Sequence, residues 1–330
     1  MNTEHRPSSR VFHALHVPAV MVGLALLAVY TIWRSTYLAV RLALHSFPPL
    51  LLSSRRFLLA GSLLFLILRL RGVPAPTPRQ WAWAAVIGSL LLGVCQGGVA
   101  FAQQWLPSSV AAIAIATIPF WTVLFQGIWG QWPRRQEWGG LLIGLAGVVL
   151  LNVDDAFRAN LPGAFLVLFA AASWAFGSAW KRHLSLETSL MTNAAEMMAA
   201  GMLLLLLHPF VERQGSGPIT LSSLLAVLYL AVFGGIIVYS AYMYLLGHVS
   251  SALATSYAYV NPVVAVGLGL GLAGEHMSLL GLIALVVILV GAGCILLKDQ
   301  SSRFDSTTSV FGSKKWRGKR AIHFTREEHR

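Results

Sequence analysis

The chain has 330 residues, of which 56% are hydrophobic and 11% are charged, and its formal net charge is +12. Soluble globular proteins have about 45–50% apolar and about 25% charged residues, so this composition excludes an ordinary soluble enzyme and a receptor with a single membrane anchor. Because a membrane-spanning helix needs about 20 mostly apolar residues, the chain has enough apolar sequence for about ten such helices, and we predict an all-α membrane protein.

Ten apolar runs follow one another along the chain, and each is predicted to be a membrane-spanning helix. The first run follows Arg6 and Arg10 as a signal peptide would, but it is too long for one and has no small-residue cleavage pattern. The fifth run is short, and the second is interrupted by charge. The predicted spans are 17–44, 48–68, 81–103, 108–130, 138–152, 161–180, 189–208, 221–246, 250–273 and 277–297.

The charged residues between these runs predict how the chain is oriented in the membrane. If residues 1–16 are cytoplasmic, the inner loops hold more Lys and Arg residues than the outer loops. Basic residues are enriched on the cytoplasmic side, so both termini are predicted to be cytoplasmic, including a basic and disordered tail at 298–330. This distribution explains the net charge without nucleic acid, which we do not expect as a partner. The inner-loop residues are Arg69, Arg71, Arg79, Arg134, Arg135, Lys181 and Arg182, and the outer-loop residues are Arg41, Arg158 and Arg213.

Residues 17–152 and 161–297 resemble two copies of one five-helix unit, joined by a periplasmic linker at 153–160. An aromatic–x–Ser–x–aromatic pattern occurs in the first span of each copy, from Trp33 to Tyr37 in one and from Phe176 to Trp180 in the other. The two copies therefore share a local pattern at equivalent places.

The second spans of the two copies also correspond. Arg56 and Gly61 match Glu196 and Gly201, at nearly the same offset along the chain as the aromatic pattern. Because five is an odd number, consecutive copies must insert in opposite orientations. Inverted repeats of this kind are typical of secondary transporters, whose substrate site lies near the membrane midplane between the repeats.

Two prolines predict interrupted helices at equivalent places, Pro119 in the fourth span and Pro262 in the ninth. Each proline removes the hydrogen bond to the carbonyl four residues earlier, at Ile115 and Ala258. Interrupted helices in equivalent positions of two repeats point to the substrate site of a transporter, so we predict that Pro119 and Pro262 are hinges.

Several short motifs resemble one family of membrane proteins. They are Ile32-Trp33 with Ser35-Thr36-Tyr37, Arg56-Phe57, Ser173 to Ser178, and Ser251 to Tyr257 followed by Asn261-Pro262-Val263. On these motifs, which extend over residues 17–297, the chain is similar to the ten-helix EamA-type permeases of the drug/metabolite transporter superfamily, especially the YedA-like group of bacterial inner-membrane exporters. The family usually has glycine where this chain has Arg34, and the tail at 298–330 has no counterpart in it.

The resemblance implies a central substrate cavity lined by aromatic and amide side chains. Aromatic faces hold apolar or cationic groups, and amides orient polar ones. The alternative for the Trp and Tyr residues is an aromatic belt at the lipid interface. The residues expected to line the cavity are Trp33, Arg34, Ser35, Gln96, Trp121, Trp174, Ser178, Tyr242, Tyr257 and Asn261.

Three charges within predicted spans need polar surroundings, because an ionised side chain at membrane depth costs at least about 2.5–3.5 kcal/mol. Arg34 would either bind a carboxylate or phosphate of the substrate or extend to the outer interface. Arg56 and Glu196 are expected to form an ion pair with each other, because opposite charges in a bilayer tend to pair. The alternative is that they act directly on the substrate or on a coupling proton.

These features predict a secondary transporter that exports small metabolites, amino acids or drug-like compounds across the bacterial inner membrane by alternating access. The candidate coupling ion is the proton, although no single residue identifies it. The alternatives are an uptake permease for an amino acid, sugar or related solute and, in a different class, a membrane-embedded enzyme. The sequence shows no nucleophile–base set, phosphate loop or paired metal-ligand spacing, so we expect neither catalysis nor a cofactor or metal. Residues 269–274 have the glycine pattern of dinucleotide sites, but they lie in an apolar run rather than after a strand. A monomer and a homodimer are both compatible with the sequence.

Overall fold

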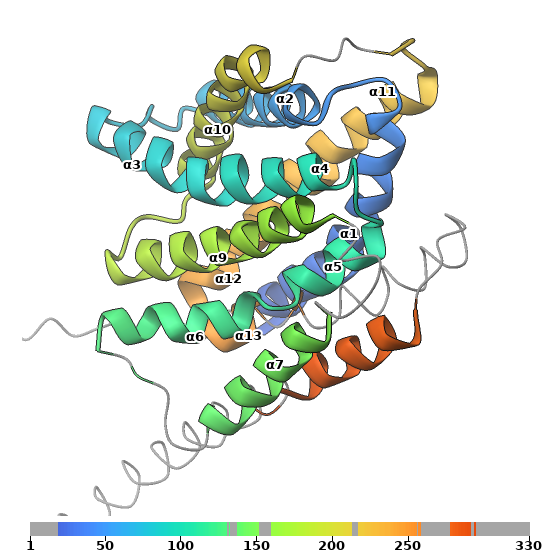
Figure 1. The fold of residues 1–330 in the computed structure, drawn as a ribbon. Helices are drawn as coiled ribbons and strands as arrows, with labels where there is room; N and C mark the ends of the chain where they lie inside the picture. The colour runs from blue at the N-terminus through green and yellow to red at the C-terminus, as the bar shows by residue number, and fades with distance from the viewer. Residues whose placement is uncertain are drawn as a thin grey trace, which may run out of the picture.

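A computed structural model gives the fold of the chain (Figure 1). It describes residues 19–130, 132, 137–151, 160–212, 217–255, 257–258, 278–291 and 294. The candidate site residues Asn261 and Pro262 lie outside these ranges, as do the terminal segments 1–16 and 298–330 and most of the linker 153–160. The backbone of Arg34 is described, but its side chain is not.

The described residues form helices and contain no strand, which confirms the predicted all-helical class. In chain order the helices are α1 (Ala19–Leu44), α2 (Pro49–Leu70), α3 (Pro78–Gly88), π-helical η1 (Ser89–Gly97), α4 (Gly98–Ala102), α5 (Ser108–Ile115), α6 (Ile118–Ile128), α7 (Glu137–Leu151), α9 (Leu161–His183), α10 (Leu190–Val211), α11 (Leu221–Tyr229), π-helical η2 (Leu230–Tyr239), α12 (Ser240–His248) and α13 (Ser251–Thr255). A further apolar helix covers Leu279–Gly291.

Six of the helices in the described part of the chain are long and apolar enough to cross a membrane. They are Val20–Leu44, Pro49–Leu70, Pro78–Ala102, Leu161–His183, Leu190–Val211 and Leu221–His248. Ile118–Ile128 and Leu279–Gly291 are apolar but shorter. Each of the six long helices overlaps one predicted span.

Local sequence signals explain where several of these helices begin. Thr77 and Gln80 form a reciprocal capping box at the start of α3, where the Thr77 side chain accepts a hydrogen bond from the Gln80 backbone N–H at 3.3 Å. Asn160 accepts one from Gly163 N–H at 2.7 Å at the start of α9, and Ser189 caps α10 in the same way.

The predicted fourth span is broken in two. α5 ends at Ile115 and α6 begins at Ile118, with Pro119 in its first turn. Pro119 has no N–H to donate, and in the first turn of a helix that N–H would have no partner within the helix, so the place where the helix restarts suits this proline. The break is present in the structure, whereas hinge motion at Pro119 stays a prediction.

The helices α2 and α10, which are the second helices of the two predicted repeats, cross with almost no space between their backbones. A Cβ atom added to Gly61 would lie 2.9 Å from the Ala194 carbonyl oxygen and 2.9 Å from Met198 N, and one added to Gly201 would lie 2.9 Å from Leu58 N. Gly61 meets Met198, and Gly201 meets Leu58, so the two helices run in opposite directions at the crossing. The number of residues from Leu58 to Met198 equals the number from Gly61 to Gly201. Only glycine permits this approach.

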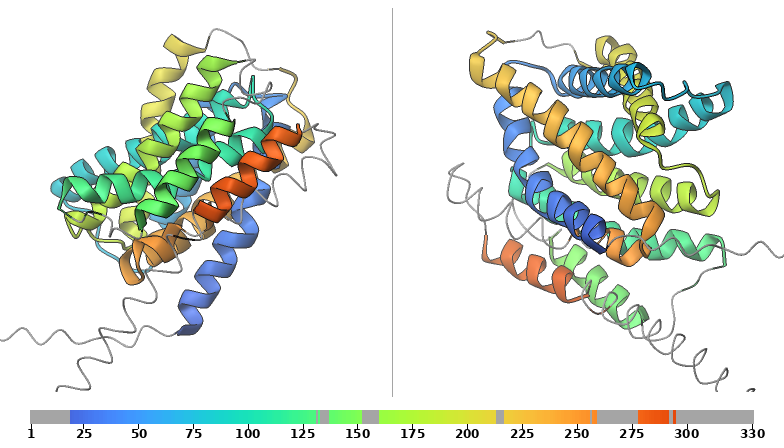
Figure 2. Two further views of the ribbon diagram at one scale, coloured as in Figure 1. Left: turned by 60° about the horizontal axis from the view of Figure 1, so that its bottom comes forward. Right: turned by 180° about the vertical axis from the view of Figure 1, so that it is seen from behind.

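The same arrangement recurs between α7 and the helix Leu279–Gly291, which lie side by side in Figures 1 and 2. A Cβ atom on Gly147 would lie 2.6 Å from Ile288 Cγ1, and one on Gly291 would clash with the backbone N of Gly144. Gly291 follows Gly147 at the same offset at which Ile288 follows Gly144. In both helix pairs, the two contacting positions of one helix are therefore separated from the two contacting positions of the other by nearly the same number of residues.

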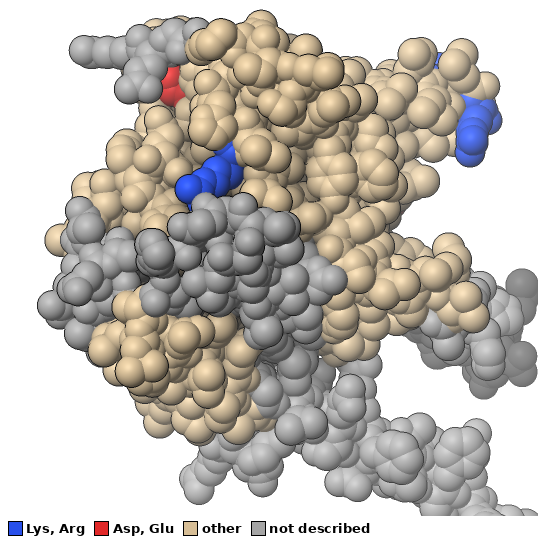
Figure 3. Space-filling view, turned by 90° about the vertical axis from the view of Figure 1, so that its right-hand side faces the viewer, with Lys and Arg blue, Asp and Glu red and all other residues tan. Residues whose placement is uncertain are grey.

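The surface between the helix ends is apolar. The face of the molecule in Figure 3 is nearly free of Lys, Arg, Asp and Glu side chains over its described part. Leu206, Phe165 and Phe210 are 62%, 70% and 84% exposed. Large apolar side chains left open in this way belong in lipid rather than in water, which agrees with a membrane protein.

The helix crossing gives a stability prediction. We expect Gly201→Leu to lower the free energy of unfolding by about 1–3 kcal/mol or more, because a side chain there must force the two backbones apart. Gly23→Leu is the matched control, since a Cβ at Gly23 meets nothing within 4 Å. Thermal unfolding of the purified proteins measures both, and equal midpoints for the two variants would contradict the crossing.

Candidate functional site

Four aromatic side chains from four segments meet in the interior of the bundle. Trp33 of α1 stacks on Tyr257, with ring centroids 4.6 Å apart, and Trp33 meets Trp174 of α9 edge-on at 5.2 Å. Tyr242 of α12 lies 5.0 Å from Trp174 and 5.6 Å from Tyr257. All four side chains are buried, so they form a packed aromatic cluster between the first helix and three segments of the second half.

Hydrogen bonds fix the orientation of Tyr242 within this aromatic cluster. Trp174 Nε1 donates to Tyr242 Oη at 3.1 Å, and Ser178 Oγ lies 2.7 Å from the same oxygen. Trp174 and Ser178 are one helical turn apart on α9, so both side chains point to the same side of that helix. The Trp174 N–H and the Tyr242 hydroxyl are therefore satisfied while the ring faces remain apolar surfaces.

The structure brings together five of the predicted cavity residues, Trp33, Trp174, Ser178, Tyr242 and Tyr257, and places the others elsewhere or leaves them undescribed. Ser35 points to α11, where its hydroxyl lies 2.6 Å from Tyr229 Oη. Trp121 Nε1 donates to Thr117 Oγ1 at 3.2 Å, beside the helix break at Pro119. That these side chains line a substrate cavity stays a prediction.

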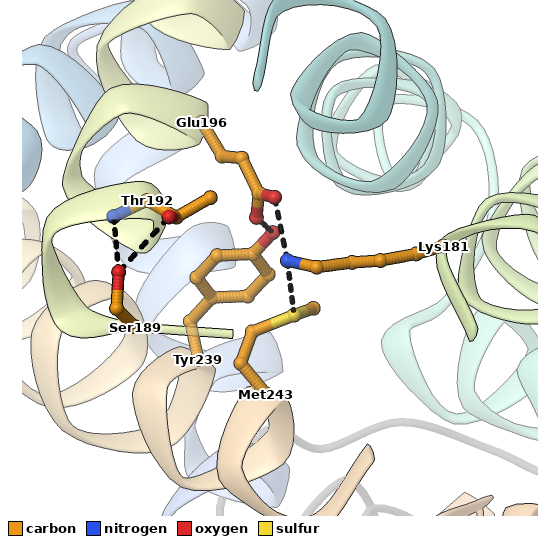
Figure 4. A network of polar contacts seen from close by, with 6 residues as sticks. All are labelled: Lys181, Ser189, Thr192, Glu196, Tyr239 and Met243. Carbon is orange, nitrogen blue, oxygen red and sulfur yellow. Dashed lines mark hydrogen bonds and ion pairs between the residues drawn. The ribbon is translucent and has the colours of Figure 1, made fainter. Parts of the chain in front are cut away.

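Glu196 belongs to a buried polar network, shown in Figure 4, that the sequence did not predict. Lys181 Nζ lies 2.6 Å from Glu196 Oε1 and 3.3 Å from Met243 Sδ, and Tyr239 Oη donates to Glu196 Oε2 at 2.5 Å. Lys181 and Glu196 are each only 1% exposed. The ion pair joins α9 to α10, and Tyr239 adds η2.

The expected ion pair between Arg56 and Glu196 is therefore not the one found, because Glu196 pairs with Lys181. Lys181 was assigned to an inner loop, but α9 continues to His183 and keeps Lys181 inside the bundle. The spacing of three residues from Ser178 and seven from Trp174 places Lys181 on the inward face of α9, and this spacing is the signal that could have identified it.

The Arg56 side chain points from α2 to η1 and away from Glu196. Its Nη2 lies 3.5 Å from Gln96 Oε1 in η1, and its guanidinium carbon lies 4.4 Å from the centroid of the Phe57 ring. In the predicted repeat Gln96 and Tyr239 would be equivalent, with an offset close to that of Arg56 and Glu196. Arg56 contacts Gln96 of η1 and Glu196 contacts Tyr239 of η2, so the two charges face different helices rather than each other.

A pocket of about 490 Å³ opens at the end of the bundle where α1 meets α2. Polar side chains from the last turn of α1, from the α1–α2 loop and from the segment after α4 line it, including Arg41, His45, Ser46, Gln103 and Gln104. Nearby, Glu212 accepts hydrogen bonds from Leu50 N–H at 2.6 Å and Leu51 N–H at 3.3 Å and thereby caps α2. This end of the molecule is thus polar and recessed.

The buried network gives a second stability prediction. We expect Glu196→Gln to lower the free energy of unfolding by about 3–5 kcal/mol, because it leaves the Lys181 ammonium buried without a counter-charge. The double variant Lys181→Met/Glu196→Gln should unfold at a higher temperature than Glu196→Gln alone, since it removes that charge. Glu187→Gln, at an exposed acceptor for Gln80, is the control and should unfold as the unmodified protein does. A double variant less stable than Glu196→Gln would contradict the assignment.

Several known proteins are similar to this chain in sequence or in fold. The EamA-like transporter family model matches residues 20–153 and 161–297. The "Uncharacterized inner membrane transporter YedA" of Escherichia coli K12 is 46% identical over 275 residues, which cover 82% of this chain and 90% of that protein. The "Probable amino-acid metabolite efflux pump" of Salmonella typhimurium is 24% identical and covers 82% of this chain and 92% of its own length.

A solved crystal structure, 24% identical in sequence, has the same fold with a TM-score of 0.61, covering 84% of this chain and 96% of its own. The family model matches most of the chain, and its two matched segments contain α1–α7 and α9 onward respectively. The chain belongs to the EamA-like transporter family and is a membrane transporter of the drug/metabolite type.

Proposed function

We propose that the protein moves small organic solutes across the bacterial inner membrane by alternating access of two inverted five-helix halves. The single observation that supports this most is the pairing of equivalent helices, α2 with α10 and α7 with Leu279–Gly291, through glycine contacts that recur at a nearly constant offset and in reversed order. A twofold axis between inverted repeats generates such contacts. In this proposal α5 and α6 together form the fourth of ten spans, and α13 begins the ninth.

The aromatic cluster is the proposed wall of the substrate site. It joins α1 of the first half to three segments of the second half, which is where inverted-repeat transporters bind their substrates. In the present conformation the rings of Trp33 and Tyr257 are stacked, so a substrate enters only when they separate. The helix break at Pro119 is the proposed place where the first half bends to allow this.

The cargo proposed here comprises small metabolites, amino acids or drug-like compounds, and the proposed direction is outward. The printed name of the Salmonella relative, an amino-acid metabolite efflux pump, supports that direction. We propose protons as the coupling ion, because a bacterial exporter works against a concentration gradient and the inner membrane maintains a proton gradient.

The proposed topology puts the basic end of the bundle in the cytoplasm. Gln80 Nε2 donates to Glu187 Oε2 at 2.9 Å, which joins the end that carries Arg69, Arg71 and Arg79 to the end of α9 that carries Arg182. At the opposite end of the bundle, a hydrogen bond of 2.7 Å between Ser46 and Ser223 joins the loop after α1 to the start of α11. Basic residues favour the cytoplasmic side, so both chain termini would be cytoplasmic.

Purified protein in liposomes tests the transport proposal. With a panel of amino acids, sugars, amines and drugs, measured with and without a pH gradient, we expect uptake or release of at least one compound that depends on the protein and increases with the gradient. Trp33→Leu should slow that transport about tenfold or more, because it removes the ring that stacks on Tyr257. Trp138→Leu, at an exposed position of α7, is the control. If no compound moved in either direction, the transporter proposal would fail.

Cysteine labelling in intact cells tests the topology separately. After both native cysteines are replaced by serine, Ala75→Cys between α2 and α3 and Ile219→Cys before α11 each offer one exposed thiol. A membrane-impermeant maleimide should label the Ile219→Cys protein in intact cells and the Ala75→Cys protein only after permeabilisation. The reverse pattern would show that the basic end faces outward.

A further inference from the structure

Arg56 carries a buried charge that no carboxylate of the described residues neutralises. Its side chain is 5% exposed, and its Nε has no hydrogen-bond partner. Its Nη2 reaches Gln96 Oε1 only at 3.5 Å, the outer limit of a hydrogen bond. The ion pairs between described residues join Lys181 to Glu196 and His208 to Glu212, and neither includes Arg56.

An unpaired guanidinium inside a membrane is costly, and such charges are normally paired or mark a substrate pathway. The second half of the protein follows the first option, since Glu196 accepts from both Lys181 and Tyr239. At the equivalent place in the first half, Arg56 has only a neutral amide and the Phe57 ring. The missing counter-charge must come from elsewhere.

Other polar groups lie near the same point. Ser53 precedes Arg56 by one helical turn on α2, is fully buried, and its Oγ also has no partner. When Gln96 turns its oxygen to Arg56, its amide N–H groups remain as donors. A guanidinium fork, a hydroxyl and an amide are the donors that a planar carboxylate uses.

The chain neighbours of the polar group belong to the same buried core as the aromatic cluster. Phe57 and Cys95, next to Arg56 and Gln96 in the chain, lie in the apolar core that also contains the four rings of that cluster. A solute bound with its anionic end at Arg56 would therefore have an apolar core with aromatic rings, the Phe57 ring among them, around the rest of its body.

We propose that Arg56 binds the carboxylate of the transported solute, with Gln96 and Ser53 as supporting donors, and that the protein accordingly prefers organic acids that carry a hydrophobic body. This assignment rests on the proposed transport function and adds the charge class of the substrate. It also explains why the charge at position 56 is left without a partner: the substrate supplies one during each cycle.

A binding assay on the purified full-length protein tests this without requiring transport. The probes are phenylacetate and its neutral counterpart phenylacetamide, which differ in the carboxylate alone. Binding is measured as a rise in the unfolding temperature and as a change in tryptophan fluorescence, since Trp33 and Trp174 belong to the neighbouring aromatic cluster. The variants are Arg56→Gln and Arg56→Lys, and the control is Arg69→Gln on the exposed end of the same helix, where Arg69 bonds the Val73 carbonyl.

We expect phenylacetate, and not phenylacetamide, to stabilise the unmodified protein and the Arg69→Gln variant. Arg56→Gln should weaken phenylacetate binding about tenfold or more and leave the unfolding temperature of the ligand-free protein unchanged or raised, because it removes an uncompensated charge. Arg56→Lys, which keeps the charge but loses the fork, should bind with intermediate affinity and serves as the test if Arg56→Gln fails to fold.

The proposal is overturned if phenylacetate does not bind, if the acid and the amide bind equally well, or if Arg56→Gln binds phenylacetate as the unmodified protein does. The liposome panel separates this inference from the proposed function. Protein-dependent transport in which acids have no advantage over their amides, and which Arg56→Gln leaves unchanged, would overturn the role of Arg56 and keep the transporter. A panel in which nothing moves would overturn the transporter, while the binding assay would still report on Arg56.

Discussion

The backbones of α2 and α10 approach each other at Gly61 and Gly201 more closely than any side chain would permit, and much of the interior depends on this contact. Arg56 and Glu196 each precede one of these glycines by five residues, so the crossing determines where both charges point. One faces η1 and the other faces η2. A close crossing of two helices through small residues is the usual substitute, within a bilayer, for the hydrophobic driving force that water provides to soluble proteins.

The two segments that match the family model, residues 20–153 and 161–297, each bury a charge, but the surroundings of the two charges differ. Lys181 and Tyr239 contact both oxygens of Glu196, so an ion pair at 2.6 Å joins α9 to α10 and a hydrogen bond at 2.5 Å adds η2. In the first half, the residue that corresponds to Lys181 is Leu38, and Arg56 has no charged partner among the described residues. The two segments that match the family model therefore differ in the electrostatics of their buried charges. That difference gives one half a closed polar network and the other a polar group able to accept an anion.

Much of the candidate site followed from sequence pattern, and the reasons for success and failure are physical. The family resemblance named Trp174 and Ser178, which lie one turn apart on one face of α9, and the structure brings that face against Tyr242. Lys181 continues the same face but was assigned to a loop, since a charge at the end of an apolar run usually marks the membrane boundary. Glu196 consequently received the wrong partner, because pairing by position in a repeat ignores the direction in which each side chain points.

The sequence by itself determined the helical membrane class, the approximate position of the long spans, the break before Pro119 and the family. The first three depend on composition, on short-range periodicity and on the absence of an N–H in proline, all of which are local properties of the chain, whereas the family was named from the resemblance of short motifs. Only the tertiary structure decided that Glu196 pairs with Lys181, that Arg56 meets Gln96, and that Trp33 stacks on Tyr257. Those contacts join helices far apart in the sequence, and the rotation of each helix about its own axis is fixed only when all of them pack together.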